Sequence, residues 1–198
     1  MKENEIRSFD SELEYNNESR TLKGYAVVFN SETRLKDNIY EVIQPTALDG
    51  VIQNSDIFAL YEHDKNRGLL ARSKYGNGTL ALQVDEKGLL FEFEAPNTQL
   101  GNEVLEMVKR GDVSKCSFSF RVEKGGCKYN KREDGTYLRV INQIAELADI
   151  SLVSQPAYDD TYVEIKRSIE AIEEEETKRA KEELQAYYNN LRNKYLTT

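Results

Sequence analysis

Three side chains in three separate apolar runs are of the types that perform nucleophilic catalysis. His63 is the only histidine in the chain of 198 residues, and it follows an alternating apolar run. Ser117 and Asp149 lie inside two further alternating runs. A serine, a histidine and a carboxylate on separate strands are the parts of a serine hydrolase, in which the histidine takes the proton of the serine hydroxyl.

Ser117 lies on the polar side of its predicted strand, because side chains alternate along a strand. Cys116, Phe118 and Phe120 face one way and predict the core side, whereas Ser117 and Ser119 face the other. That second face could present a nucleophile. The plainer interpretation is two ordinary serines on a solvated face, and the strand by itself favours it.

His63 follows Ile57, Ala59 and Tyr61 in the alternation, which places it on the apolar face of the predicted strand, at the end of that strand. A lone histidine at a strand end is most often structural or simply exposed. However, histidine ordinarily titrates near neutral pH, as a general base requires. If the chain is a Ser-His hydrolase, His63 must be the base, because there is no other histidine.

Two carboxylates compete for the third role, Glu146 and Asp149. Their odd separation places them on opposite faces of a regular strand, so they cannot both orient His63. Asp149 shares its face with Ser151 and is expected to be partly buried, where a carboxylate needs a hydrogen-bonded partner. That partner is either the imidazole or an arginine such as Arg121. The residues themselves leave both assignments open.

Composition indicates one globular domain with an appendage. Hydrophobic residues make up 39% of the chain, and the net charge of -8 disfavours nonspecific binding to nucleic acid or to anionic membranes. No apolar run approaches the length of a membrane span, and the charged N-terminus has no signal-peptide segment. Cys116 and Cys127 form no metal-ligand pattern, so we expect no disulfide, and an intracellular, reducing environment.

The pattern of elements is mostly β from residue 20 to residue 153. Two helical stretches interrupt it, at residues 45–52 and 98–110, the second capped by Thr98 and closed by Gly111. Beyond residue 168 an acidic run precedes apolar residues at helical spacing. We therefore expect a polar N-terminal arm (1–19), a main domain (20–167) and a charged amphipathic C-terminal helix (168–198).

Several short stretches, in this order, resemble motifs of the tailed-phage prohead protease family, the serine proteases of capsid maturation. Residues 40–48 (YEVIQPTAL) resemble E-x-I-x-P-G-A-F, 59–64 (ALYEHD) resemble L-x-x-H-D, 70–73 (LARS) resemble L-G-R, 85–89 (DEKGL) resemble D-x-x-G-L, 111–113 (GDV) resemble G-x-I, 117–120 (SFSF) resemble S-F-G-F, and 149–158 (DISLVSQPAY) resemble E-V-S-L-V-x-x-P-A. Each piece is short, but their common order over residues 20–167 is specific.

The resemblance implies a fold similar to that of the herpesvirus maturation protease (assemblin). That is a mainly β fold with helices (α+β), namely a closed β-barrel with surrounding helices. It also implies that Ser117 is the nucleophile and His63 the base. Asp149 aligns with the third catalytic position, where the herpesvirus enzymes have a second histidine. The chain departs from the family pattern at Ser119 and Thr46, which replace glycines, and at Asp149, which replaces the usual glutamate.

The function that the resemblance implies is endopeptidase cleavage of the major capsid protein and the scaffold protein inside the immature capsid, in the host cytoplasm. No cofactor, metal, nucleic acid or membrane is implied, and homo-oligomerisation stays open. Backbone amides are expected to stabilise the oxyanion, with Arg72 as a further candidate. The alternatives are a non-catalytic β-barrel scaffold or assembly factor, and an esterase or amidase. The latter is disfavoured because no glycine-flanked nucleophile elbow surrounds Ser117.

Overall fold

The computed structural model describes residues 4–9, 13–16, 18–155 and 162–196. Its contacts divide the chain into two units, residues 1–159 and 160–198. The described strands all belong to the first unit, and the second contains the helix α3 (Tyr162–Leu196). Among the helices described, none combines the length and the apolar character that crossing a membrane requires.

The elements follow one another in a mostly β order. The strands are β1 (Glu5–Phe9), β2 (Glu14–Asn16), β3 (Thr21–Val28), β4 (Thr33–Lys36), β5 (Ile39–Ile43), β6 (Asp56–Tyr61), β7 (Ala71–Lys74), β8 (Asn77–Gly78), β9 (Ala81–Val84), β10 (Gly88–Glu94), β11 (Lys115–Val122), β12 (Cys127–Lys131), β13 (Tyr137–Ile141) and β14 (Ile144–Val153). The helices are the 3-10 turns η1 (Pro45–Leu48) and η2 (Lys65–Arg67), α1 (Val51–Asn54), α2 (Gln99–Arg110) and α3.

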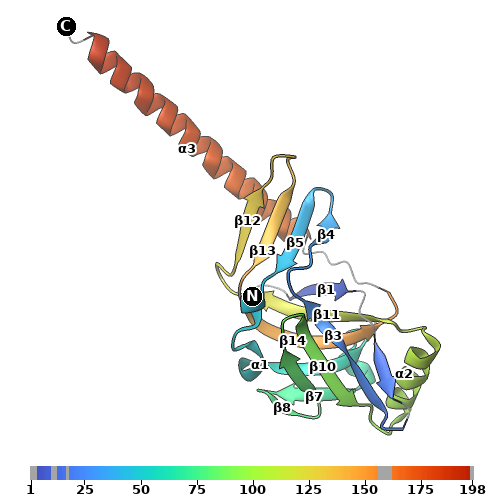
Figure 1. Ribbon diagram of the computed structural model, residues 1–198. Helices are drawn as coiled ribbons and strands as arrows, with labels where there is room; N and C mark the ends of the chain where they lie inside the picture. Colours follow the sequence, from blue (N-terminus) through green and yellow to red (C-terminus); the bar gives the residue numbers. More distant parts are fainter. Residues whose placement is uncertain (1–3, 10–12, 17, 156–161, 197–198) are drawn as a thin grey trace. The chain divides into compact units, whose positions relative to one another are not determined.

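The described strands of the first unit form three sheets (Figure 1). Their strand orders are β1-β11-β14-β6-β7-β8, β2-β3-β10-β9 and β12-β13-β5-β4. In the six-stranded sheet, β14 pairs antiparallel with β11 and parallel with β6. The strands that carry Ser117 and Asp149 and the strand that ends before His63 are therefore immediate neighbours.

The core lies on the apolar side of β11, as the alternation of its side chains predicts. Cys116, Phe118 and Phe120 have no exposed surface, and the two phenyl rings stack with centroids 4.9 Å apart. The helix α2 precedes β11 and has the ends expected from its sequence. Thr98 accepts a hydrogen bond from the backbone N–H of Gly101, and Gly111 adopts the left-handed conformation that terminates a helix.

The mainly β, α+β class is confirmed, but the closed barrel is not. Each of the three sheets has two end strands in the described part of the chain, so none closes on itself. The six-stranded sheet ends at β1 and β8, and β8 has only two residues. A barrel needs hydrogen bonds between its first and last strands, and these two strands make none with each other.

A cluster of four buried charges joins the first sheet to the third. Arg7 donates to both carboxylate oxygens of Glu41, at 2.7 and 3.0 Å, and to Glu5 at 2.8 Å. Arg139 donates to Glu5 and to Glu41, each at 2.6 Å. Burial alone raises the pKa of Glu41, but the two guanidinium groups outweigh it, so that its pKa lies below the ordinary value. The cluster contains two acids and two bases, so its formal charges cancel.

Replacing Glu41 with glutamine is expected to destabilise the protein by about 3–5 kcal/mol, because it leaves one positive charge of this cluster without a partner in the interior. Urea unfolding measures the loss. Glu146→Gln is the matched control: its carboxylate pairs with Arg121 at the surface, so its loss should cost about 0–1 kcal/mol. Since the pKa of Glu41 is lowered, its contribution should be present above pH 4.5 and disappear as the pH falls through the folded-state pKa. Equal losses for the two variants would contradict this account.

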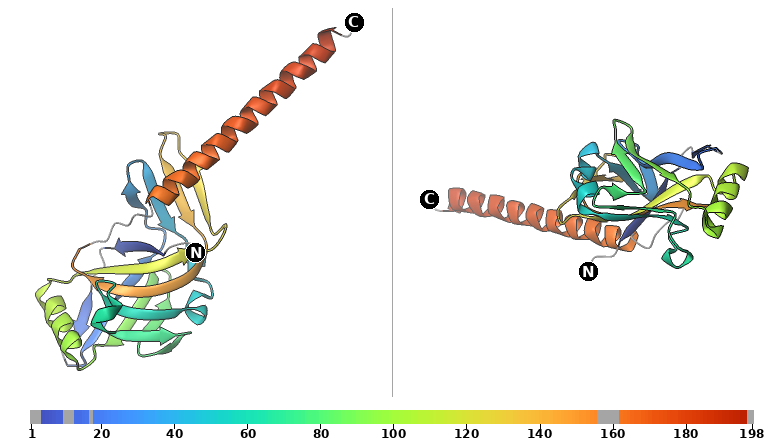
Figure 2. Two further views of the ribbon diagram at one scale, coloured as in Figure 1. Left: turned by 180° about the vertical axis from the view of Figure 1, so that it is seen from behind. Right: turned by 90° about the horizontal axis from the view of Figure 1, so that it is seen from below.

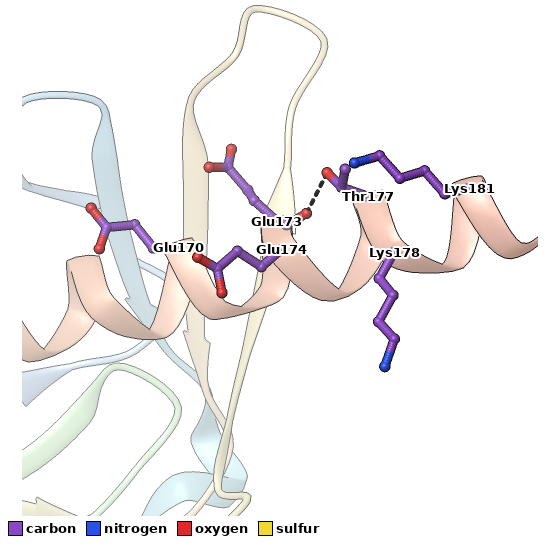
Figure 3. Close-up of a pocket in the computed structure, with 6 residues that line it drawn as sticks. All are labelled: Glu170, Glu173, Glu174, Thr177, Lys178 and Lys181. Atoms are coloured by element: carbon purple, nitrogen blue, oxygen red, sulfur yellow. Dashed lines mark hydrogen bonds between the residues drawn. The ribbon is translucent and has the colours of Figure 1, made fainter.

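The second unit is a single charged helix. Figure 3 shows six side chains on one stretch of α3, with three glutamates (Glu170, Glu173, Glu174) followed by Thr177, Lys178 and Lys181. Thr177 donates to the carbonyl oxygen of Glu173 at 2.8 Å. Glutamates that precede lysines by four residues stabilise an isolated helix. These six side chains line a hollow on one side of a single helix. Because one helix by itself does not enclose a ligand, this hollow is not assigned a binding function.

Candidate active site

His63, Ser117 and Asp149 meet in one continuous hydrogen-bonded chain. The Nε2 atom of His63 lies 2.7 Å from the hydroxyl oxygen of Ser117, and its Nδ1 atom lies 2.6 Å from an oxygen of Asp149. The imidazole is 16% exposed and the carboxylate 7%. These three candidate residues from the sequence are therefore each within hydrogen-bonding distance of the next.

The pairing of three strands produces this arrangement. In the antiparallel pair, Ser117 lies opposite Ser151, and Ser119 lies opposite Asp149. Ser117 and Asp149 thus occupy diagonal positions on one face of the sheet. On the other side of β14, the parallel strand β6 ends at Tyr61, which lies opposite Leu152, so the chain turns three residues along β14 from Asp149.

The turn after β6 directs His63 toward the other two residues. Glu62 and His63 both have positive φ angles, 53° and 57°, which is uncommon for residues other than glycine. The backbone N–H of Glu62 donates to Leu152 at 3.1 Å, and the Glu62 carboxylate accepts hydrogen bonds from the backbone and the hydroxyl of Ser154. These contacts with β14 and the residue after it hold a conformation that is itself unfavourable by about 1–3 kcal/mol.

Ser151 supports the carboxylate from the same strand. Its hydroxyl donates to Asp149 at 2.7 Å, to the oxygen atom that also contacts His63. Ser151 has no exposed surface. A buried donor of this kind fixes the orientation of the carboxylate. Sequence reasoning did not find the roles of Ser151, Glu62 or Ser154; only the alternation of Ser151 with Asp149 indicated that the two share a face.

Glu146 does not reach the histidine, for a reason different from the one expected. The register of β11 and β14 shifts so that Ala148 is an extra residue, and Arg121 then lies opposite Glu146. This bulge moves Glu146 to the face that carries Asp149, whereas a regular strand would separate them. Glu146 accepts a hydrogen bond from Arg121 at 2.9 Å. The arginine partner considered for Asp149 thus belongs to Glu146.

The serine face is buried, which contradicts the interpretation of two serines exposed to solvent. Ser117 is 0% exposed and Ser119 5%. The physical reason is that β1 pairs along the outer edge of β11, and that the His63 turn lies at the other side of Ser117. Ser117 also donates to the carbonyl oxygen of Arg7 in β1, at 3.0 Å.

Two further polar groups near the site have other partners. Burial raises the pKa of the Cys116 thiol, which lies on the core side of β11, so this thiol is not an activated nucleophile. Arg72 donates to the carboxylate of Asp56, with one contact at 2.7 Å, and its guanidinium lies 4.9 Å from the centre of the Phe58 ring. Arg72 is thus held in an ion pair on β6 and β7.

This geometry is that of a serine hydrolase. A hydroxyl, an imidazole and a carboxylate in this order allow proton transfer away from the hydroxyl while the carboxylate orients the imidazole. The model of the caudovirus prohead serine protease family matches residues 4–175. The chain belongs to this family and is a serine protease with a role in capsid maturation.

Two other comparisons add little to the family match. A search of curated protein sequences finds no match. Among solved structures, the chain is similar to the bacteriophage T4 capsid assembly protease, with a TM-score of 0.46 and 8% identity. The likeness covers 78% of this chain and 98% of the T4 chain. At this identity and TM-score it carries no argument about mechanism.

Proposed function

We propose that Ser117 is the nucleophile, His63 the general base and Asp149 the orienting carboxylate of this protease. The observation that carries the proposal is the unbroken chain of contacts from the Ser117 hydroxyl through both imidazole nitrogens to Asp149. Ser117 attacks the scissile carbonyl carbon while its proton passes to His63. The imidazolium then returns this proton to the leaving amine.

Asp149 and Ser151 determine which nitrogen of His63 serves as the base. The carboxylate accepts a hydrogen bond from the protonated Nδ1, which leaves the lone pair of Nε2 facing Ser117. Water then attacks the acyl-enzyme, and the same nitrogen accepts the proton of that water. The buried setting strengthens each of these electrostatic contacts.

The substrates that we propose are the major capsid protein and the scaffold protein, cut at internal peptide bonds inside the immature capsid of the infected cell. Family membership supports this choice of substrates. The test is co-expression with the cognate coat and scaffold proteins, comparing wild type with Ser117→Ala by the masses of the fragments. Identical, uncleaved products from both chains would favour a non-catalytic assembly factor instead.

Replacing Asp149 with asparagine is expected to lower the cleavage rate by about 10²–10⁴-fold, since the amide allows the imidazole tautomer that has its proton on Nε2. The rate of fragment formation measures the effect. Glu146→Gln is the control on the same strand, and it should change the rate less than about threefold because Glu146 pairs with Arg121. If Glu146→Gln lowered the rate more than Asp149→Asn, the orienting role would belong to Glu146.

For the domain organisation we propose a protease domain at residues 20–167 and a separate function for the charged helix of residues 168–198. Leu184, Tyr187 and Tyr188 on this helix are each more than half exposed, which suits contact with a scaffold segment or a second copy. Truncation after Arg167 should therefore retain cleavage of a peptide in solution and reduce incorporation into capsids. A truncated chain that does not fold would show that the helix completes the core.

A further inference from the structure

The nucleophile strand has an occupied outer edge. β1 pairs antiparallel with β11 over five residue pairs, from Glu5 opposite Phe120 to Phe9 opposite Cys116. Figure 2, seen from behind, shows the dark blue β1 alongside the yellow β11 and the orange β14. In this register Ser8 lies directly opposite Ser117. An extended peptide from the chain itself therefore lies beside the serine.

In this arrangement Ser117 is closed to an external peptide. The side chain is 0% exposed, and its hydroxyl donates to the carbonyl oxygen of Arg7. A substrate carbonyl carbon must come within about 3–3.5 Å of the hydroxyl oxygen for attack. A group without exposed surface is not reached by a peptide from solution, so β1 must move before a substrate binds.

The Ser117 hydroxyl has a single proton, and β1 competes for it. When the proton is donated to the Arg7 carbonyl oxygen, it is not donated to Nε2 of His63. General-base activation needs the second arrangement. The contact with β1 thus opposes both access to the nucleophile and its activation.

The buried charges hold β1 in place and let it leave without a net charge penalty. β1 contributes one acid, Glu5, and one base, Arg7. Glu41 and Arg139 remain behind, already joined at 2.6 Å, as a neutral pair. The cost of desolvating buried ions offsets much of their attraction, so such a cluster determines the register of β1 without making its docking irreversible.

We propose that the edge of β11 beside Ser117 is the docking site for an extended substrate peptide, and that β1 fills this site as an intramolecular occupant. The chain is then latent until β1 leaves, and a substrate segment takes its place by pairing as an antiparallel strand. This inference rests on the proposed role of Ser117 as the nucleophile. It adds that the first strand regulates access to that residue.

The test measures how fast a fluorophosphonate probe labels the full-length chain. In labelling, a bond forms between the Ser117 oxygen and phosphorus, fluoride leaves, and the proton passes to His63. The double variant Glu5→Gln/Arg7→Met releases β1 from its ion pairs and removes one charge of each sign. It should be labelled at least about tenfold faster than wild type, in proportion to the population with β1 undocked.

The matched control is Glu32→Gln/Arg132→Met, which removes a surface ion pair by the same two replacements. Its labelling rate should stay within about twofold of wild type, because neither residue contacts β1. Amide hydrogen exchange shows independently whether β1 is released, since undocked strands lose protection.

A second variant keeps the test decisive if the double variant does not fold. Phe9→Cys places a thiol opposite Cys116, so that oxidation with diamide ties β1 to β11. The oxidised form, verified by mass, should be labelled at least about tenfold more slowly than the same protein after reduction. Equal labelling rates of the oxidised and reduced forms would overturn the proposal.

The two proposals fail in different ways. If wild type is labelled at Ser117 as fast as the released variant, β1 does not regulate access, although Ser117 is a nucleophile. If no form is labelled while hydrogen exchange shows that β1 has been released, the assignment of Ser117 itself is wrong. That outcome removes the inference along with the function on which it rests.

Discussion

Ser117→Ala should abolish cleavage of the co-expressed capsid proteins and leave the protein folded. In the proposed mechanism the hydroxyl oxygen forms the acyl bond, and loss of such a group lowers the rate by about 10⁴–10⁶-fold. The side chain lies on the face opposite Phe118, so its replacement opens no cavity in the apolar core. The hydroxyl lies within hydrogen-bonding distance of both His63 and Arg7, and the loss of the bond that it donates sets the expected loss of stability at about 1–3 kcal/mol.

Ser119→Ala is the matched control for this prediction. Ser119 lies two residues along β11 on the same face and is also buried, so the two variants differ mainly in which hydroxyl is lost. The Ser119 variant should retain cleavage within about tenfold of wild type, since it keeps every group of the proposed proton path. If Ser119→Ala is inactive while Ser117→Ala cleaves, the nucleophile has been assigned to the wrong serine.

His63→Ala should be as damaging as Ser117→Ala. The imidazole contacts the Ser117 hydroxyl, and the sequence contains no second histidine to replace it. Groups that act as one catalytic unit are not additive, so Ser117→Ala/His63→Ala should be hardly worse than either single change, within about tenfold. The cleavage rates of wild type and of these three variants, measured by fragment masses under one condition, form a double-mutant cycle.

Additive losses in that cycle would show that His63 and Ser117 act independently. The control for folding is urea unfolding of His63→Ala. Because His63 occupies a turn with a positive φ angle that Glu62 and Ser154 hold, alanine at position 63 inherits the same backbone strain. A variant that is fully folded and inactive is the expected result.

The local pattern of the sequence was sufficient to predict several elements, among them β11 and α2, and to single out the candidate residues. Alternation along β11 separated Phe118 and Phe120 from Ser117, and Thr98 and Gly111 marked the ends of α2. The single histidine left one candidate base. These features depend on neighbours within a few residues, which is why they can be predicted from the sequence.

The tertiary structure decided how those residues meet and what covers them. The extra residue at Ala148 in β14 moves Glu146 to the face of Asp149, because one inserted residue reverses the alternation on one side of a bulge. The strands that the structure describes form three open sheets and not a closed barrel, since closure depends on pairing between distant strands.

The pairing of β1 with β11 is the clearest case. Residues 4–9 form a short, mostly polar segment, and the sequence by itself predicted only a polar arm at residues 1–19. Only the folded chain brings Glu5 and Arg7 to Glu41 and Arg139, which follow them by more than thirty residues. A buried ion cluster is a property of distant partners. Local sequence therefore identifies Ser117 as a candidate nucleophile, and tertiary structure determines whether it is accessible.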